Sequence, residues 1–327
     1  MTKAIRIEKT GGPEVLQWQD VQLAAPKSGE VRVRHTAVGV NFIDIYHRTG
    51  LYKLPLPAGL GLEAAGVVEG VGTGVTRFRE GDRIAYASGP IGAYSEAANV
   101  VADRAVKIPE GVSDDIAAAI LLKGLTAHYL LRRTYKVKQG DTILFHAAAG
   151  GVGMIAVQWA KSLGATVIGT VGNDKKVALA ERLGCAHVIV TSRENVANRV
   201  REITGGKGVP VAYDSIGRDT FMATIDSIAP LGLFVSFGNA SGPVPPFEAS
   251  ILAQKGSLFF TRPTLANYVT TPEELDIAAG ELFDLVARGV VRKNEPKRFA
   301  LSQAAEAHRA LESRQTTGSL VLIPDGV

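Results

Sequence analysis

"TILFHAAAGGVGMIAVQWAKSLG", residues 142–164, is the stretch of sequence that decides the fold of this chain. Its apolar start at 142–145 predicts a buried strand, and the small residues at 147–153 predict a turn. Apolar residues at helical spacing through 152–163 predict a helix that stops at Gly164. This order is typical of a dinucleotide-binding unit, because glycines let the backbone approach a pyrophosphate and a helix N-terminus offers free N–H groups.

The fingerprint departs from G-x-G-x-x-G at its first position, where Ala148 precedes Gly150 and Gly153. A tight strand-to-helix turn that binds nothing is the alternative interpretation. The surroundings favour a cofactor site, since another predicted strand at 166–171 directly follows the helix.

Strands and helices alternate after residue 141, which indicates a parallel, doubly wound sheet with a ligand site at the carboxyl ends of its strands. The further strands are predicted at 187–190, 209–214 and 232–237, and the further helices at 175–183, 193–204 and 221–228. Residues 1–110 differ, because short apolar runs at 4–8, 31–40, 64–71 and 83–86 alternate with Gly/Pro turns. Such spacing favours a small barrel or sandwich.

The linking and terminal segments are mainly helical. Ser113 is a candidate cap for a helix through residue 122, and 125–133 predicts another. The last 60 residues or so return to the first domain in our interpretation, with elements expected at 272–288, 298–301, 304–313 and 319–323.

Composition sets outer limits on function. Hydrophobic residues are 46% and charged residues 21% of the 327, as in ordinary globular proteins, and the sequence predicts neither a membrane span nor a signal peptide. The single cysteine, Cys185, excludes an internal disulfide and any multi-cysteine zinc site, and we expect a cytoplasmic protein. The scattered net charge of +4 leaves both an anionic ligand and nucleic acid open.

Several segments together resemble the zinc-free medium-chain dehydrogenase/reductase family, in its quinone oxidoreductase (zeta-crystallin-like) branch. They include GGPEVLQ (11–17), VGVNFIDIYHRTGLY (38–52), GLEAAGVVEGVGTGV (61–75), KGLTAHYLL (123–131), FHAAAGGVG (145–153), FGNASG (237–242) and TRPT (261–264). The resemblance implies an α/β fold, a Rossmann doubly wound parallel sheet plus a β-rich GroES-like barrel domain with a cleft between them. The implied domains are 1–122 with 265–327, the catalytic GroES-like part, and 123–264, the cofactor-binding part.

Metal ligands are missing where zinc-dependent relatives have them. Those relatives place a cysteine where this chain has Asn41 and a histidine where it has Leu62. A catalytic zinc needs about three protein ligands, so we expect no metal. What remains is hydride delivery from NADPH to an acceptor that needs little activation, such as a quinone or a conjugated carbonyl.

Cofactor choice depends on the end of the second strand of this unit. No acidic residue stands at Thr170, and lysines follow, which favours NADPH over NADH. The resemblance places Gly172, Lys176 and Ser192 beside the 2′-phosphate, with Asp174 unfavourable there and Arg193 a candidate to compensate it. Lys123 is either a further cofactor contact or a helix-surface residue. The other cofactor contacts that the resemblance implies are Asn41, Thr126, Tyr129, Gly150, Gly151, Val152, Gly153, Phe237, Gly238, Asn239, Arg262 and Arg314.

The candidate catalytic residues are Asn41, Tyr46, Tyr52 and Thr126. The resemblance implies that Asn41, Tyr46 and Tyr52 lie in a loop on the substrate side of the cleft. By resemblance, Asn41 approaches the nicotinamide ribose and the tyrosines flank the acceptor, whereas two packed tyrosines with satisfied hydroxyls are the alternative. Asp44 is either a general acid or a structural hydrogen-bonding residue. His146, at a strand end, is either part of a proton relay or held in place structurally.

The leading function is an NADPH-dependent quinone reductase. An NADPH-dependent enal, enone or enoyl-thioester reductase is the enzymatic alternative, and an RNA-binding or structural crystallin-like protein is an alternative of another class. Because no arginine-rich or aromatic-interleaved basic stripe is present, nucleic-acid binding is not favoured. The β-prone run GSLFF (256–260) predicts an edge strand, and family members pair such edges, so we expect a homodimer.

Overall fold

The computed structural model describes residues 1–292, 295–313 and 316–325. The chain divides into two compact units, which are described separately. Unit 1 comprises Met1–Lys123, Val269–Ala287 and Lys293–Val327, and unit 2 comprises Gly124–Tyr268 and Arg288–Arg292. The chain therefore leaves its first unit and returns to it. No helix in the described part of the chain has the length and apolar character needed to cross a bilayer.

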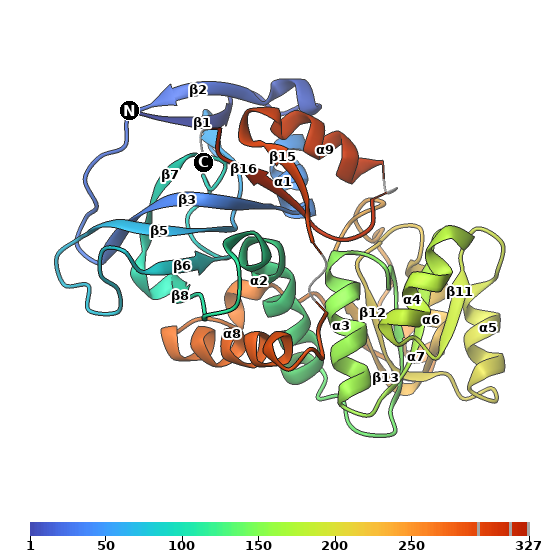
Figure 1. Ribbon diagram of the computed structural model, residues 1–327. Helices are drawn as coiled ribbons and strands as arrows, with labels where there is room; N and C mark the ends of the chain where they lie inside the picture. The colour runs from blue at the N-terminus through green and yellow to red at the C-terminus, as the bar shows by residue number, and fades with distance from the viewer. Residues whose placement is uncertain (293–294, 314–315, 326–327) are drawn as a thin grey trace. The chain divides into compact units, whose positions relative to one another are not determined.

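Unit 2 is built on a six-stranded sheet in the order β11-β10-β9-β12-β13-β14, with every pairing parallel. This confirms the doubly wound sheet. Its strands are β9 (Thr142–Phe145), β10 (Thr166–Val171), β11 (His187–Val190), β12 (Val209–Asp214), β13 (Ile228–Ser236) and β14 (Phe259–Thr261). Its helices are α3 (Gly151–Ser162), α4 (Val177–Leu183), α5 (Val196–Ile203), α6 (Phe221–Ser227) and α7 (Ser250–Gln254), several of them visible in Figure 1.

The turn between β9 and α3 is too tight for a side chain at Gly153. A Cβ atom there would lie 2.3 Å from the carbonyl oxygen of Ala147 and 2.7 Å from that of Ala148. Alanine in place of the first glycine of the fingerprint is accommodated, because Ala148 is fully buried and donates its N–H to Thr170 at 3.0 Å. The departure from the fingerprint therefore leaves the strand–turn–helix unit intact.

Unit 1 contains a three-stranded sheet, order β2-β1-β4, and a seven-stranded sheet, order β15-β16-β3-β5-β6-β8 with β7 paired to β3. These two sheets are the form taken by the expected β-rich domain, and Ala4 in the first of them also forms an isolated antiparallel bridge with Ser95. The strands are β1 (Thr2–Ile7), β2 (Gln17–Val21), β3 (Glu30–Val40), β4 (Ala58–Gly59), β5 (Ala64–Val71), β6 (Arg83–Tyr86), β7 (Ala97–Val101), β8 (Ala105–Lys107), β15 (Lys297–Ala300) and β16 (Leu320–Ile323).

The helices of unit 1 are α1 (Phe42–Thr49), α8 (Pro272–Ala287), α9 (Ala304–Glu312) and most of α2 (Asp114–His128). Figure 1 shows α9 beside β15 and β16, and α9 contributes Ala304 and Ala307 to a core that also contains Leu320 and Leu322 of β16. The C-terminal segment is thus part of the same hydrophobic core as the N-terminal strands.

Two local expectations were wrong. The segments 113–122 and 125–133 form one helix, because α2 runs through Gly124 and continues as a π-helical turn, Tyr129–Thr134. Ser113 does cap it, accepting from the amide of Ile116 at 3.4 Å. The loop expected to carry Asn41, Tyr46 and Tyr52 instead contains α1, which ends at Gly50 with a left-handed φ of 82°.

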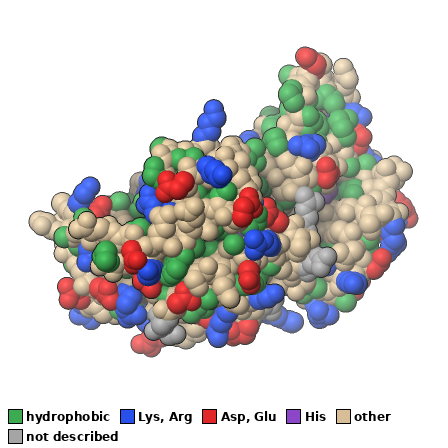
Figure 2. Space-filling model, turned by 90° about the horizontal axis from the view of Figure 1, so that it is seen from above, with side chains coloured by type: hydrophobic (Ala, Val, Ile, Leu, Met, Phe, Trp, Pro, Cys, Tyr) green, Lys and Arg blue, Asp and Glu red, His purple; other side chains and the backbone are tan. Residues whose placement is uncertain are grey.

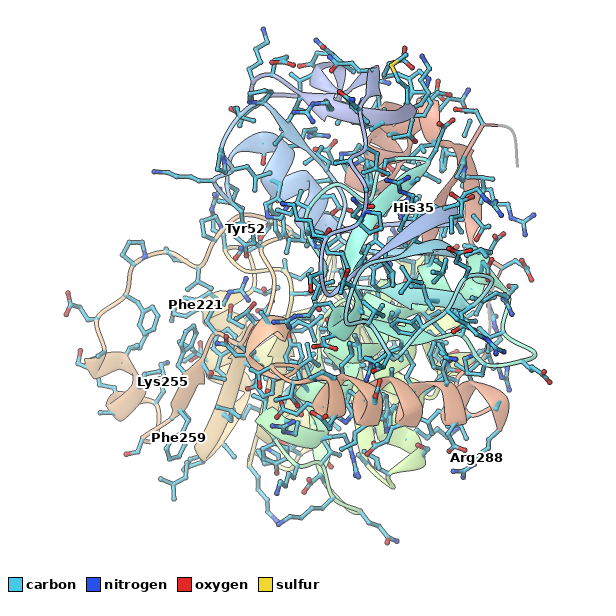
Figure 3. The ribbon with its side chains drawn as sticks, turned by 90° about the vertical axis from the view of Figure 1, so that its left-hand side faces the viewer. His35, Tyr52, Phe221, Lys255, Phe259 and Arg288 are labelled. Carbon is cyan, nitrogen blue, oxygen red and sulfur yellow. The ribbon has the colours of Figure 1, made fainter. Side chains whose placement is uncertain are left out.

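The edge of the unit 2 sheet is formed by β14, which confirms the predicted edge strand, although it covers only Phe259–Thr261. Phe259 lies on this outer strand with 61% of its surface exposed (Figure 3). The neighbouring Lys255 is paired with Asp226 at 2.6 Å. An exposed aromatic side chain on a sheet edge is a feature that soluble proteins usually cover.

Candidate functional site

A buried polar cluster surrounds the side chain of Asn41, directly before α1. The Asn41 amide nitrogen donates to Glu63 Oε2 at 2.7 Å, and Lys123 Nζ lies 3.4 Å from the same oxygen. The other oxygen, Oε1, accepts from the backbone amide of Leu122 at 2.7 Å. Gly39 allows this packing, since a Cβ there would lie 2.3 Å from Glu63 Oε2.

Lys123 is therefore not a helix-surface residue. Its ammonium is buried and compensates Glu63, whose side chain has no exposed surface. A buried ion pair of this kind fixes geometry more than it adds stability, because desolvation offsets much of the attraction. The consequence is that the amide of Asn41 is oriented by a charge that water does not reach.

The two candidate tyrosines of unit 1 are brought into contact. Tyr46, on α1, and Tyr52, just after it, pack edge to face with ring centroids 5.2 Å apart. The amide of Tyr52 donates to the carbonyl of Tyr46 at 3.0 Å, and His47 packs on the Tyr52 ring. Tyr46 is buried, and Tyr52, labelled in Figure 3, is half-buried. The two rings thus form one aromatic pair, on and just after the helix that Asn41 begins.

Asp44 is a structural hydrogen-bonding residue in this arrangement. Its Oδ2 accepts from the backbone amide of Asn41 at 2.8 Å and from the Tyr94 hydroxyl at 3.0 Å. The carboxyl has no exposed surface, and its Oδ1 has no hydrogen-bond partner in the described structure. Burial raises the pKa of Asp44 to about 7, although the two donors act to lower it.

In unit 2, Thr126 and Tyr129 are both buried. Tyr129 begins the π-helical turn and stacks on Tyr268, with centroids 4.6 Å apart and planes at 15°. Single π-helical turns inside α-helices are frequent at functional sites. The two candidates therefore lie one turn apart on the same helix.

The candidate phosphate-binding turn is completed by the N-terminus of α3. Gly150 precedes the helix, and Gly151, Val152 and Gly153 form its first turn, where backbone N–H groups have no partner within the helix. Beneath the turn His146 is fully buried. Its ring contacts the hydroxyls of Thr170 at 3.2 Å and Thr224 at 3.0 Å, and burial lowers its pKa. His146 is thus held structurally.

The end of β10 carries the residues predicted beside a 2′-phosphate. Gly172 is exposed and has no atom within 4 Å of where a Cβ would stand, which leaves room for a ligand. Lys176 is half-buried, and the burial lowers the pKa of its ammonium. Asp174, the unfavourable carboxylate, is paired with Arg193 Nη2 at 2.9 Å. Ser192 adjoins Arg193 and is exposed.

The remaining cofactor candidates follow β13 and β14. Gly238 is required to be glycine, because a Cβ would lie 2.6 Å from the Ser215 carbonyl oxygen, and Asn239 beside it is buried. Phe237 packs on Phe145 of β9. Arg262 is exposed, and its guanidinium approaches the Pro263 carbonyl at 3.4 Å. Arg314 lies outside the described residues.

The donor set does not fit a catalytic zinc. Around Asn41 the available groups are an amide, an ammonium and a carboxylate already paired with both. Over 1–292, 295–313 and 316–325, no three His, Cys, Asp or Glu side chains are arranged to hold a metal ion. Cys185 is buried against Gly169, and burial raises the pKa of its thiol to about 12, which makes it a packing residue.

Family models match parts of both units, and known proteins are similar to this chain over nearly its whole length. Residues 27–110 match the alcohol dehydrogenase GroES-like domain and residues 151–275 the zinc-binding dehydrogenase family. A quinone oxidoreductase of Pseudomonas aeruginosa is 56% identical over 325 residues, 99% of this chain and 100% of the relative. The chain belongs to the quinone oxidoreductase branch of the medium-chain dehydrogenase/reductase family.

Two further proteins are similar to this chain over nearly its whole length. The crystal structure of Escherichia coli quinone oxidoreductase complexed with NADPH has a TM-score of 0.97 and 51% identity, covering 98% of this chain and 100% of that one. A 2-haloacrylate reductase from a Burkholderia species is 47% identical over 332 residues, covering 99% of each chain. The two relatives are therefore named for different acceptors, a quinone and a 2-haloacrylate.

Sequence reasoning missed four residues that the structure places around α1: Arg48, Glu63, Tyr94 and His308. All four are buried and polar or hydrogen-bonding, and they come from four separate segments. The G-L-E motif at 61–63 was one available signal, because a carboxylate in an otherwise apolar strand start requires a partner.

We predict that activity is independent of zinc. Protein purified without chelators should contain no stoichiometric zinc by elemental analysis, and dialysis against EDTA should leave turnover unchanged, because no suitable ligand set is present. A zinc-dependent alcohol dehydrogenase treated in parallel should lose activity. Stoichiometric zinc together with EDTA-sensitive turnover would contradict the prediction.

Proposed function

We propose that this protein is an NADPH-dependent quinone reductase that works without a metal. The observation that carries the proposal is full-length identity above 50% to quinone oxidoreductases, joined to a phosphate-binding turn and a cationic β10 end. NADPH, when bound, supplies the hydride. A quinone needs little activation, because its reduced form is stabilised by delocalisation, so the protein mainly aligns the reactants and excludes water.

The residues of unit 2 supply the binding groups for such a cofactor. The first turn of α3 offers N–H donors to the pyrophosphate, and Lys176 offers a point charge to the 2′-phosphate. Arg193 is paired with Asp174, which offsets the repulsion of this carboxylate toward an anion. Thr126, Tyr129 and Asn239 are the buried polar groups proposed to orient the nicotinamide.

The residues of unit 1 act on the acceptor. Asn41, whose side-chain amide is held by Glu63, offers a polar group to the acceptor. Tyr46 and Tyr52, packed edge to face, offer aromatic side chains against which a quinone ring can pack. The protons needed by a reduced quinone end on oxygen and exchange readily with solvent. No side chain of unit 1 is then required as a proton donor.

Reduction of a conjugated acid or carbonyl is the second candidate, favoured by the 47% identity to a 2-haloacrylate reductase. Such an acceptor is protonated at carbon, where a positioned acid is valuable. Tyr46 and Tyr52 are the candidates for that acid. By contrast, Figure 2 shows basic and acidic side chains interspersed on the face it presents, which is no support for a nucleic-acid surface.

A panel of acceptors assayed with wild type, Tyr46→Phe and Tyr52→Phe separates these functions. With 1,4-benzoquinone and 9,10-phenanthrenequinone we expect turnover in all three proteins and only a few-fold loss of kcat in the variants. A general acid contributes about 10²–10⁴-fold, so loss on that scale, with circular dichroism unchanged, would identify an essential donor. Turnover of enones or crotonyl thioesters without quinone turnover would replace the first function by the second.

Lys176→Ala should raise the KM for NADPH about tenfold to a hundredfold and leave the KM for NADH nearly unchanged, because it deletes a charge-assisted phosphate contact. Lys175→Ala is the matched control, since Lys175 is the exposed neighbour. It should have little effect on either KM. Equal effects of Lys176→Ala on both cofactors would show that this lysine does not bind the 2′-phosphate.

The exposed edge β14 supports a homodimer, in which two such edges pair across a two-fold axis. Light scattering at micromolar concentration should give twice the mass of one chain. Phe259→Lys should shift the mass toward the monomer, whereas Ile277→Lys, which changes an equally exposed apolar residue on α8, should not. A monomeric wild type would contradict the proposal.

A further inference from the structure

A continuous hydrogen-bonded network inside unit 1 connects both ends of α1 to α9. At the carboxyl end of α1, Arg48 pairs with Glu312, with Nη2 and Nη1 at 2.6 and 3.1 Å from the two carboxylate oxygens. Arg48 Nη1 also lies 3.1 Å from Nδ1 of His308. From there the network returns to the first turn of α1, because Tyr94 contacts His308 Nε2 at 2.9 Å and Asp44 Oδ2 at 3.0 Å.

The direction of each hydrogen bond in this network follows from chemistry. A guanidinium has only donors, so Nδ1 of His308 must accept and carry no proton. The single proton of the neutral ring is then on Nε2, which donates to the Tyr94 oxygen. Tyr94 in turn donates its own hydrogen to Asp44. Burial and the facing Arg48 charge lower the pKa of His308 to about 3, which agrees with a neutral ring.

A second histidine–tyrosine pair in the same unit has the opposite direction. Nδ1 of His35 contacts the Ser95 carbonyl oxygen at 2.7 Å, and a carbonyl can only accept, so Nδ1 carries the proton. Nε2 of His35 therefore accepts from the Tyr86 hydroxyl, 2.9 Å away. The neighbouring partners, rather than the pair itself, decide the tautomer. In the described part of the chain, the pair of His35 and Tyr86 makes no hydrogen bond to α1.

We propose that Tyr94 and His308 are positioning residues of the reductase: fixed by Arg48, they donate toward Asp44 and hold the first turn of α1, and with it Asn41. The inference rests on the proposed function. A helix of eight residues is too short to be stable alone, so its place depends on such tertiary contacts. Asp44 is the last residue of this hydrogen-bonded network, and its ionised form is the stronger acceptor for the backbone amide of Asn41.

The charged and titratable groups that face this network are few. Glu63 raises the pKa of Asp44 and Lys123 lowers it, both weakly relative to burial and to the two hydrogen bonds. Arg48, His308, Tyr94 and Glu312 are members of the network itself. His47, on α1, is buried, and burial lowers its pKa. Removing the Tyr94 hydroxyl therefore removes one of the two direct donors to Asp44.

Two readouts test the proposal. The first uses ring ¹⁵N chemical shifts of the wild type at pH 7, with His308→Gln to assign the signals of His308. We expect a proton on Nε2 for His308 and on Nδ1 for His35. A protonated Nδ1 on His308, or a doubly protonated ring, would overturn the proposal. This measurement needs neither turnover nor cofactor, so it stands even where the proposed function fails.

The second readout is the dependence of kcat/KM on pH. As pH falls through the pKa of Asp44, the carboxylate is protonated, so we expect an acid limb in the wild type. Tyr94→Phe should move that limb upward by about one pH unit, because a donor to the ionised form is lost. The matched control, Tyr86→Phe, should leave the limb where it is in the wild type.

A purely structural role would lower activity at every pH without moving the limb, and an unmoved limb in Tyr94→Phe would overturn the proposal. His308→Gln and His308→Leu add a rescue comparison, since glutamine retains both an acceptor and a donor and leucine retains neither. We expect His308→Gln to be several-fold more active than His308→Leu. Equal losses in the two variants would count against the proposed direction of the hydrogen bonds through His308.

Discussion

Three carboxylates without exposed surface, Asp44, Glu63 and Asp214, constrain much of this structure. A desolvated carboxylate costs several kcal/mol unless donors surround it, so each one dictates the position of the backbone and side chains nearby. Asp214 accepts from the amides of Ile216 and Gly217 and from the hydroxyls of Thr220 and Thr224. It thereby fixes the loop after β12, as Glu63 fixes the amide of Asn41.

The features that could be predicted from the sequence are those that depend on residues close together along the chain. The central parallel strands β9, β10 and β12 were predictable because apolar runs of four to six residues that are buried on both faces carry their own signal. The phosphate-binding turn was predictable for the same reason, since its glycines and helix start are local in sequence. Both depend on neighbours along the chain rather than on distant partners.

The environment of Asn41 was not predictable in this way. Lys123 and Glu63 are 60 residues apart, and nothing local distinguishes a buried lysine from a surface one until its partner is known. His308 and Arg48 are separated by 260 residues. The expectation that Asn41, Tyr46 and Tyr52 lie in a loop was wrong, because Asn41 and Asp44 form a capping box that begins α1, and Arg48 ties its other end to α9.

The two units use charge under different conditions. At the end of β10 the pair of Arg193 and Asp174 is more than half exposed, and the lysines beside it are reached by water and salt. At physiological ionic strength, salt largely screens interactions between such exposed charges when they are more than about 8 Å apart, so this surface suits a ligand that must bind and leave. Around α1 the pair of Glu63 and Lys123 and the hydrogen bonds that join Asp44, Tyr94 and His308 are buried, and salt does not reach them. That arrangement suits residues that must keep one orientation through many turnovers, because a buried polar network with its donors in place has few alternative arrangements of similar energy.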